Sequence, residues 1–303
     1  MNKVPLLTIA IPTYNRAAQL DAQLHHLFQM LENHWNECQL MVSDNASTDS
    51  TAIVCQTWQE RGGGRLTVAT QPTNLGLVGN VSYCLREAVG RYVWVVGDDD
   101  TIRVDALEVL LNTLKTYPET GLVHLNHRCI SGIDGSSVHD RFYPWQEDQV
   151  TPVGRALAEA CITHREGGLM FITAAVIRKD LALRAMATWP EGIHNLAYPL
   201  YLNSHAASDN PMVLLAAPLC DSLYFVSSWS DRHLELELHD VPEVYQQLIK
   251  VGYDPILMGR LIGRRLQGGR LRGLARLLLK KPQRLHVVLR SYQLARQARK
   301  AAE

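Results

Sequence analysis

The chain begins with apolar and amphipathic segments in alternation, which is the pattern of an α/β protein. A continuous apolar, β-branched run at residues 6–11 is typical of a strand that is covered on both faces. A helix is predicted to follow from about Arg16, because apolar side chains recur at helical spacing at Leu20, Leu24, Leu27, Phe28 and Leu31.

The same alternation continues to residue 117. Further strands are predicted at residues 39–43, 66–69 and 92–96, and further helices at 51–61, 78–88 and 104–117. Strand–helix alternation at this pitch predicts a mainly parallel, doubly wound sheet. Ligands of such sheets bind beyond the carboxyl ends of the strands. We therefore expect one crevice where three polar clusters that follow strands converge, at residues 12–16, 44–49 and 98–100.

The most informative of these clusters is the run of three carboxylates Asp98, Asp99 and Asp100, directly after a buried strand. Adjacent like charges repel each other and need compensation. A hard divalent cation, Mg²⁺ or Mn²⁺, held together with substrate phosphates, would supply it. The alternative is that one aspartate caps the following helix and the others are solvated.

Composition changes this picture little. The chain has 303 residues, of which 47% are hydrophobic and 20% charged, as in packed globular proteins. Its six cysteines form no C-x-x-C pair and several fall in apolar patterns, so we expect buried, reduced thiols and a cytosolic compartment. The sequence has no run of about 20 apolar residues, as a membrane span needs, and no signal-peptide pattern at its start. We expect the protein to stay inside the cell.

Charge, in contrast, is unevenly distributed along the chain. Residues 250–303 carry 14 Lys or Arg and two acids, whereas the preceding residues carry 16 basic and 28 acidic side chains. Two amphipathic basic helices are predicted there, near 256–265 and 271–281. This predicts a basic helical tail at 241–303 that contacts an anionic membrane surface. Packing on the acidic body, or a homo-oligomer interface, is the alternative. No nucleic-acid-binding fold accompanies the charge, so we expect no nucleic-acid partner.

Four ordered motifs give the chain a specific resemblance. Residues 8–16, residues 42–49, Asn74-Leu75-Gly76 with Asn80, and Gly97-Asp98-Asp99-Asp100 resemble those of family 2 glycosyltransferases, which are inverting, nucleotide-sugar-dependent enzymes with the GT-A fold. The resemblance covers about residues 5–115. Beyond it, residues 173–178 and 189–200 look like the acceptor half of bacterial members that build O-antigen and related polysaccharides.

The resemblance implies an organisation into regions. A GT-A domain, an α/β fold with a doubly wound, Rossmann-like mixed sheet, would occupy residues 1–240. Its nucleotide-sugar-binding half would be 1–115 and its acceptor half 116–240, followed by the C-terminal basic helical region 241–303.

The resemblance also implies roles for residues of the nucleotide-sugar pocket. Pro12 and Tyr14 would shape the nucleotide pocket, with the Tyr14 ring against the base, and Arg16 would belong to the same binding set. Asp44 would accept a hydrogen bond from the base edge, with an Asx-turn as the alternative. Asn74 and Gly76 would lie near the nucleotide-sugar, where a glycine allows close backbone approach.

The three aspartates would form a variant of the family's D-x-D motif. The commoner form is D-x-D-D, and here Gly97 stands in place of the first aspartate. This leaves the direct metal ligand open between Asp99 and Asp100. Asp98 would face the ribose or the donor sugar.

Many family members supply the general base as an aspartate in an E-D pair about 90–100 residues after the metal motif. No such pair occurs here, and the comparable place holds Glu191-Gly192-Ile193-His194-Asn195. His194 is the first candidate, because a neutral imidazole accepts a proton near neutral pH. Glu191, Asp209 and Asp231 are the alternatives. Asp231 lies in a polar, aromatic-bearing segment, 227–233, which often closes over the donor diphosphate in chains of this kind.

These expectations combine into one functional hypothesis. The protein is expected to be a metal-dependent, inverting glycosyltransferase that acts on a lipid-linked glycan at the inner face of the cell membrane, in bacterial surface polysaccharide synthesis. The alternatives are a non-catalytic nucleotide-sugar-binding protein and a sugar-1-phosphate nucleotidyltransferase. The latter should carry a Gly-rich phosphate loop after the first strand, where this chain has residues 12–16.

Overall fold

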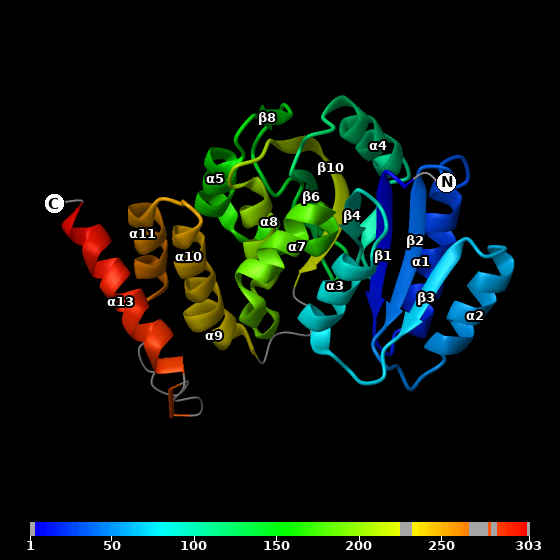
Figure 1. The fold of residues 1–303 in the computed structure, drawn as a ribbon, viewed down its shortest axis with the longest axis horizontal. Helices are drawn as coiled ribbons and strands as arrows, with labels where there is room; N and C mark the ends of the chain where they lie inside the picture. The colour runs from blue at the N-terminus through cyan, green and yellow to red at the C-terminus, as the bar shows by residue number, and fades with distance from the viewer. Residues whose placement is uncertain (1–3, 225–231, 267–277, 280–283, 302–303) are drawn as a thin grey trace.

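The computed structural model describes residues 4–224, 232–266, 278–279 and 284–301. A ten-stranded sheet runs through the molecule, and Figure 1 shows the strands of the N-terminal half at one end and the last three helices at the other. Its main path has the order β3-β2-β1-β4-β9-β6-β10-β5.

The N-terminal half has the predicted alternation, and its boundaries differ from the predicted ones by at most two residues. Its elements are β1 (Leu7–Thr13), α1 (Ala17–Met30), β2 (Cys38–Asp44), α2 (Thr51–Arg61), β3 (Leu66–Thr70), α3 (Gly76–Glu87) and β4 (Tyr92–Val95). All neighbouring strands in this half are parallel. Their carboxyl ends therefore lie along one edge.

The second half makes the sheet mixed, as predicted. β9 (Ala175–Arg178) lies between β4 and β6 (Leu122–Ser131) and is antiparallel to both, whereas β10 (Met212–Tyr224) is parallel to β6. The smaller strands are β5 (Thr101–Ile102), β7 (Ser137–His139) and β8 (Gln149–Thr151). The helices of this half are α4 (Ala106–Thr116), α5 (Arg155–Arg165), α6 (Gly167–Met170), α7 (Lys179–Thr188), α8 (Tyr198–Ala207) and the 3₁₀ turns η1 (Ile172–Ala174) and η2 (Pro190–His194).

The sheet is buried on both faces, which is why its first strand is apolar throughout. Leu7, Ile9 and Ile11 of β1 pack in one cluster with side chains of α1, α2 and α4. Ala10, on the opposite face, belongs to a second cluster with side chains of α3, α7 and α8. Alternate residues of a strand point to opposite faces, so both sets must be apolar.

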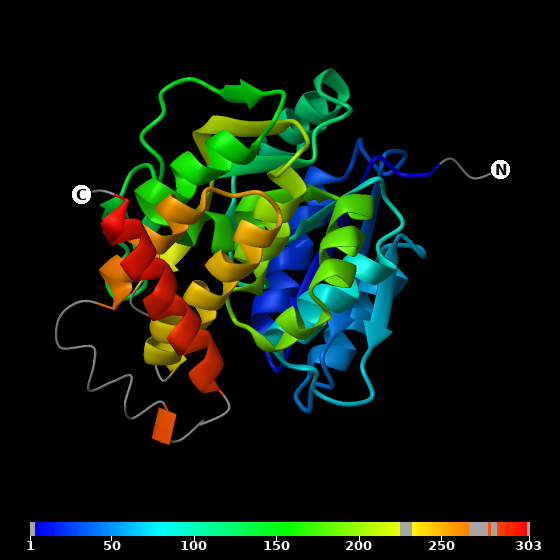
Figure 2. The same ribbon diagram turned by 60° about the vertical axis from the view of Figure 1, so that its left-hand side comes forward.

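The C-terminal helices continue this second cluster. The short helix α9 (His233–Glu235), the π-helix η4 (Leu236–Asp240) and α10 (Val241–Lys250) follow one another without a break, across the predicted boundary at residue 240. The last described helices are α11 (Pro255–Arg265) and α13 (Leu285–Lys300), which lie side by side (Figure 2). Tyr245, Ile262 and Leu294 are buried in the same cluster as Ala10. The first predicted tail helix is therefore present, and most of the second, 271–281, lies outside the described residues.

The cysteines are all buried and free, as predicted. No helix in the described ranges combines the length and the apolar character that crossing a bilayer requires.

Candidate functional site

A cavity of about 650 Å³ lies at the carboxyl ends of the parallel strands. Two of the three predicted polar clusters line it directly, and the third contributes Asn45. The structure brings together eight of the predicted site residues on its wall: Pro12, Tyr14, Arg16, Asn74, Gly76, Asp98, Asp99 and Asp100. The opposite wall is mainly apolar and comes from the second half of the chain, with Met170, Phe171, Ile172, Pro199, Ser222 and Leu223.

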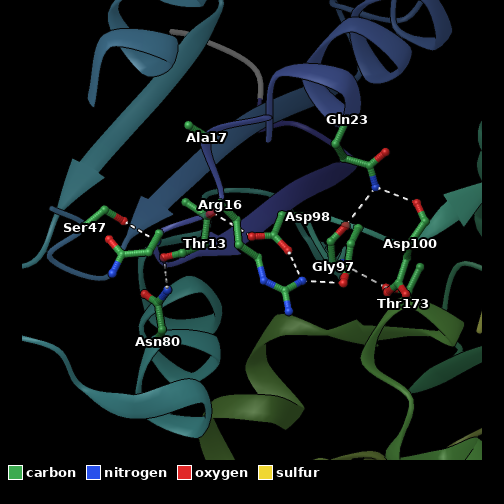
Figure 3. Close-up of polar contacts among 12 residues, drawn as sticks. Thr13, Arg16, Ala17, Gln23, Ser47, Asn80, Gly97, Asp98, Asp100 and Thr173 are labelled. Carbon is green, nitrogen blue, oxygen red and sulfur yellow. Dashed lines mark hydrogen bonds and ion pairs between the residues drawn. The ribbon is translucent and has the colours of Figure 1, made fainter. Parts of the chain in front are cut away.

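Asp98 is the most tightly held of the three aspartates. The Thr13 hydroxyl donates to its Oδ2 at 2.7 Å, and Arg16 Nη1 donates to its Oδ1 at 3.2 Å (Figure 3). Burial raises the pKa of Asp98 above its ordinary value, against the opposing effects of Thr13 and Arg16. Both carboxylate oxygens thus have a partner inside the protein.

Asp99 is the aspartate that is open to solvent, with its side chain 41% exposed. Its Oδ2 accepts a hydrogen bond from Arg16 Nη1, the same nitrogen that contacts Asp98. Although burial alone lowers the pKa of Arg16, the charges of Asp98 and Asp99 raise it overall. One guanidinium nitrogen therefore lies between two carboxylates at the cavity wall.

Asp100 is turned away from the other two. Its carboxylate accepts a hydrogen bond from the Thr173 hydroxyl, and burial raises its pKa to about 7. The Thr173 oxygen in turn accepts from the Gly97 N–H at 2.9 Å. A Cβ at residue 97 would collide with the Asp100 carboxylate, so only glycine leaves room for this arrangement. This accounts for Gly97 at the first position of the D-x-D variant.

Gln23 of α1 holds the acidic loop from the other side. Its Nε2 donates to the carbonyls of Gly97 at 2.8 Å and of Asp100 at 3.0 Å (Figure 3). Sequence reasoning missed Gln23 and Thr173. The available signal for Gln23 was a polar side chain between Leu20 and Leu24, on the apolar face of the predicted helix.

The loop before α3 is built around Asn45. The Asn45 amide donates to Asn74 Oδ1 at 3.0 Å and accepts from the Leu75 N–H at 2.8 Å. Asn74 Oδ1 also accepts from the Gly76 N–H at 2.7 Å. Gly76 has a φ of +73°, and a Cβ there would meet no atom within 4 Å. Glycine is thus favoured at this position for its backbone conformation.

The turn after β1 is shaped by Asn15, whose φ of 53° is in the left-handed region that asparagine tolerates. The Asn15 N–H donates to Ser47 Oγ at 2.8 Å, and Asn15 Oδ1 accepts from the Thr48 N–H at 2.7 Å. These bonds fix the residues on either side, Tyr14 and Arg16, at the cavity. Tyr14 is 43% exposed.

Asp44 is buried behind this wall rather than lining the cavity. Its Oδ1 accepts from the Ser47 N–H at 3.0 Å, which is the local turn contact considered above as the alternative to base recognition. In this structure Asp44 therefore supports the loop that carries the neighbouring cavity residues.

The candidate bases lie apart from the cavity or outside the described residues. Glu191 and His194 are in η2 and do not line the cavity. Asp209 is an exposed residue that forms an ion pair with Arg155. Asp231 lies outside the described residues, eight positions after Leu223, which lines the cavity. Among the described lining residues, the acidic side chains are those of the three aspartates, and none is a histidine.

The acidic loop fits a divalent cation that is shared with a substrate. Within the described parts of the chain, no three His, Cys, Asp or Glu side chains are grouped closely enough to enclose a metal alone. Asp98 and Asp99, however, present carboxylates to a single point, now taken by Arg16 Nη1. Mg²⁺ and Mn²⁺ accept one or two carboxylates together with phosphate oxygens and water.

Comparison with known proteins points to one family. The family described as Glycosyl transferase family 2 matches residues 8–181. The abequosyltransferase RfbV of Salmonella typhimurium is 28% identical over 140 residues, 46% of this chain and 41% of that protein. The GalNAc(5)-diNAcBac-PP-undecaprenol beta-1,3-glucosyltransferase of Campylobacter jejuni is 27% identical over 134 residues, 44% of this chain and 41% of that protein. The matched part thus spans about two fifths of these curated relatives.

Solved structures extend the likeness of the fold over nearly the whole chain. Residues 1–349 of S. aureus TarS, in complex with UDP-GlcNAc, give a TM-score of 0.67 at 15% identity, over 95% of this chain and 81% of that one. The mannosyltransferase PcManGT of Pyrobaculum calidifontis, in complex with GDP-Man and Mn²⁺, gives 0.60 at 17% identity, over 97% and 86%. The predicted GT-A fold is confirmed.

Proposed function

The chain belongs to glycosyl transferase family 2, and we propose that it transfers a sugar from a nucleoside diphosphate sugar to a hydroxyl acceptor, with inversion at the anomeric carbon. The observation that carries the proposal is the single cavity that joins the loops of Tyr14, Asn74 and Gly76 to the carboxylates Asp98 and Asp99. A pocket for a nucleotide and a pair of carboxylates for its diphosphate then lie side by side.

In the proposed reaction, an acceptor oxygen forms a bond to the anomeric carbon while the bond from that carbon to the diphosphate oxygen breaks. The nucleoside diphosphate leaves with the bonding electron pair, and the acceptor proton passes to a general base. Tyr14 and the Asn74–Gly76 loop would position the nucleotide. Asp99, backed by Asp98, would hold a divalent cation, which supplies Lewis-acid neutralisation of the leaving diphosphate when bound.

For the general base we propose Asp231 ahead of His194 and Glu191. Ser222 and Leu223, near the end of β10, line the cavity, and Asp231 follows Leu223 by eight positions in the sequence. His194 and Glu191 do not line it. A base must come within hydrogen-bond reach of the acceptor hydroxyl, directly or through one water.

The acceptor that we propose is a lipid-linked glycan of a bacterial surface polysaccharide. The name of the C. jejuni relative describes transfer to a glycan on PP-undecaprenol. The apolar wall of the cavity, with Met170, Phe171 and Ile172, could accommodate the less polar face of such an acceptor. Reaching a lipid-linked substrate requires the enzyme to work at a membrane surface.

The exposed face of α13 is suited to that surface. Leu285, Leu289 and Tyr292 are exposed by 47%, 54% and 39%. Exposed basic side chains accompany them, and α13 has no acidic residue; the basic residues are Arg290, Arg296, Arg299 and Lys300. Apolar and basic side chains together on one helix face favour the headgroup region of an anionic bilayer. We therefore propose that the protein is peripheral at the inner face of the cell membrane.

Binding and hydrolysis assays test the proposal. A thermal-shift screen of UDP, GDP, CDP and dTDP sugars with Mn²⁺ should give one nucleotide that stabilises the protein, and slow donor hydrolysis should follow and stop with excess EDTA. Binding without hydrolysis would instead favour the non-catalytic nucleotide-sugar-binding alternative. A full rate in excess EDTA would refute the metal role of Asp98 and Asp99.

A further inference from the structure

The guanidinium of Arg16 lies where a cation shared by two carboxylates would lie. Its Nη1 contacts an oxygen of Asp98 and an oxygen of Asp99, and these are ion pairs as well as hydrogen bonds. Among the described residues that line the cavity, Arg16 is the basic one. It therefore supplies the positive charge that the acidic loop needs when no other cation is there.

We propose that Arg16 acts as a built-in counter-ion that keeps the divalent cation off Asp98 and Asp99 until the donor diphosphate arrives. The inference rests on the proposed function for the identity of that diphosphate. A cation that binds alone must break both ion pairs of Arg16 and leave the guanidinium facing solvent or the cation itself. Both effects weaken binding of the metal alone.

A diphosphate removes this obstacle because it gives Arg16 a new partner. Guanidinium groups bind phosphate oxygens as readily as they bind carboxylate oxygens. Arg16 lines the same cavity as Asn74 and Gly76, and its side chain is 36% exposed, so it has access to a ligand bound there. When the guanidinium moves to the phosphates, Asp99 becomes free for the metal. Metal and donor then promote each other's binding, and linkage requires that this coupling be reciprocal.

Only the side chain of Arg16 has to move when it exchanges the carboxylates for phosphates, because the backbone around it is held in place. The backbone on the N-terminal side of Arg16 is fixed by the bonds from Asn15 to Ser47 and Thr48. The Ala17 N–H, on the other side, donates to Asp49 at 3.1 Å. Only the guanidinium end has to move, and Asp98 keeps its bond from Thr13 throughout.

The first measurement uses Mn²⁺ alone, followed by electron paramagnetic resonance of the free ion, on the full-length protein. Arg16→Gln should bind Mn²⁺ at least about fivefold more tightly than the wild type, which is the lower end of typical coupling between sites. The matched control is Arg103→Gln. Arg103 is similarly exposed and also pairs with an aspartate, Asp105, but lies outside the cavity. This variant should bind Mn²⁺ as the wild type does.

The second measurement repeats the titration with saturating UDP, GDP, CDP or dTDP. The nucleotide that binds should tighten Mn²⁺ binding in the wild type and do so by a smaller factor in Arg16→Gln. The melting temperature of Arg16→Gln first shows whether the variant is folded. If the folded variant binds Mn²⁺ alone no more tightly than the wild type does, the proposal is overturned. If no nucleotide binds any variant, the proposed function fails, and the comparison with Mn²⁺ alone still decides the role of Arg16.

Discussion

Gly97 lets three consecutive aspartates take different positions. Because a Cβ at this residue would collide with the Asp100 carboxylate, Gly97→Ala must displace either Asp100 or the loop. We expect overpacking of this kind to destabilise the fold by about 1–3 kcal/mol, and Mn²⁺–nucleotide affinity to fall at least about tenfold. Calorimetric titration and thermal melting measure the two effects.

Gly263→Ala provides the control for Gly97→Ala. Gly263 lies in α11, and a Cβ there would meet Ala295 Cβ at 3.5 Å, an ordinary contact. Alanine also favours a helix over glycine by up to about 1 kcal/mol. This variant should be as stable as the wild type or more so, with unchanged affinity. Unchanged affinity in Gly97→Ala would show that the Asp100 arrangement is irrelevant to the donor site.

The general base can be located by comparing three single variants. If Asp231 deprotonates the acceptor, Asp231→Ala should lose about 10²–10⁴ in turnover, with little change in nucleotide affinity. His194→Ala and Glu191→Ala should stay within about tenfold of the wild type, because neither residue lines the cavity. Steady-state transfer kinetics with the identified donor measure this. A large loss in His194→Ala alone would return the assignment to His194.

Two buried histidines of β6 should make stability depend on pH. Burial lowers the pKa of His124 and of His127 to about 3. Within the described structure, both ring nitrogens of His124 are buried without a hydrogen-bond partner. As the pH falls below about 6.5, the unfolded chain takes up protons that the folded state does not. Each histidine should therefore reduce the free energy of unfolding by up to about 1.4 kcal/mol per pH unit.

Denaturant unfolding between pH 8 and pH 5 measures this dependence. His127→Phe keeps a flat ring in the place where His127 stacks on Phe142, at 4.4 Å between ring centroids. In this variant, the free energy of unfolding should decrease less steeply below pH 6.5 than it does in the wild type. His25→Phe, at an exposed position, should leave the slope unchanged. Equal slopes in all three proteins would refute the contribution of His127.

The residues that could be predicted from sequence are those of contiguous motifs. Two examples are the pair Asp98 and Asp99 and the pair Asn74 and Gly76. Each pair adjoins predicted elements, so the order of the strands alone brings them to the same edge of the sheet. Gln23 and Thr173 act on the acidic loop from 73 to 77 positions away in sequence. Such contacts depend on how α1 and the segment before β9 pack, which no local pattern encodes.

The elements of the N-terminal half could be predicted because each buried strand is followed by an amphipathic helix. The second half of the chain has no such regularity. β9 is a four-residue strand inserted between β4 and β6, antiparallel to both. The long strand β10 carries register shifts near Pro218, because proline cannot donate a ladder hydrogen bond. Short or interrupted strands leave too few alternating positions to be recognised.

The exposed face of α13 makes a prediction at the level of one helix. Replacing Arg290, Arg296 and Arg299 by glutamine should weaken sedimentation with anionic vesicles, by about 1 kcal/mol per charge removed. Binding of the wild type should also decrease as salt rises, because exposed charge is screened within about 10 Å at 0.1 M.

Neutral vesicles and a second triple variant serve as controls for the helix face. Arg61, Arg65 and Arg103 are exposed basic residues outside the C-terminal helices. Figure 1 shows α2, which ends at Arg61, and α4, which follows Arg103, on the side of the molecule away from α13. Their replacement by glutamine should leave sedimentation unchanged. A wild type that ignores anionic vesicles at low salt would contradict the membrane proposal and favour an interface between copies of the chain.

For the whole molecule, the structure changes what a deletion of the basic tail would test. Residues 241–303 were predicted as a separate basic region, yet Tyr245 and Ile262 are buried in the cluster that covers one face of the sheet. The Tyr253 hydroxyl donates to the Ser204 carbonyl at 2.6 Å, and Asn195 donates to Glu243 at 2.8 Å. A chain cut after residue 240 would lose these contacts and expose apolar surface of the second half of the chain, so point variants separate membrane binding from stability more cleanly.

Arg265 offers the sharpest test of whether these helices unfold together with the sheet. Its side chain, 9% exposed, forms ion pairs with Glu166, at the end of α5, and with Glu237 of η4. Arg265→Met would remove the cation that pairs with the partly buried Glu166 and one partner of the partly buried Glu237. Breaking a buried pair costs about 3–5 kcal/mol, and the partial exposure of the two glutamates places the expected loss near the lower end. For a chain of this size, that corresponds to a melting temperature lower by about 5–10 °C.

The neighbouring Arg264 is the matched control, because it is exposed on the same helix. Arg264→Met should melt within about 2 °C of the wild type, since surface substitutions typically change stability by less than about 0.5 kcal/mol. If the C-terminal helices belong to the folded body, Arg265→Met lowers one cooperative transition, seen equally by calorimetry and by loss of nucleotide binding. The opposite result would be two thermal transitions in Arg265→Met, with nucleotide binding lost only at the melting temperature of the wild type. That result would show that residues 241–303 fold as an independent unit.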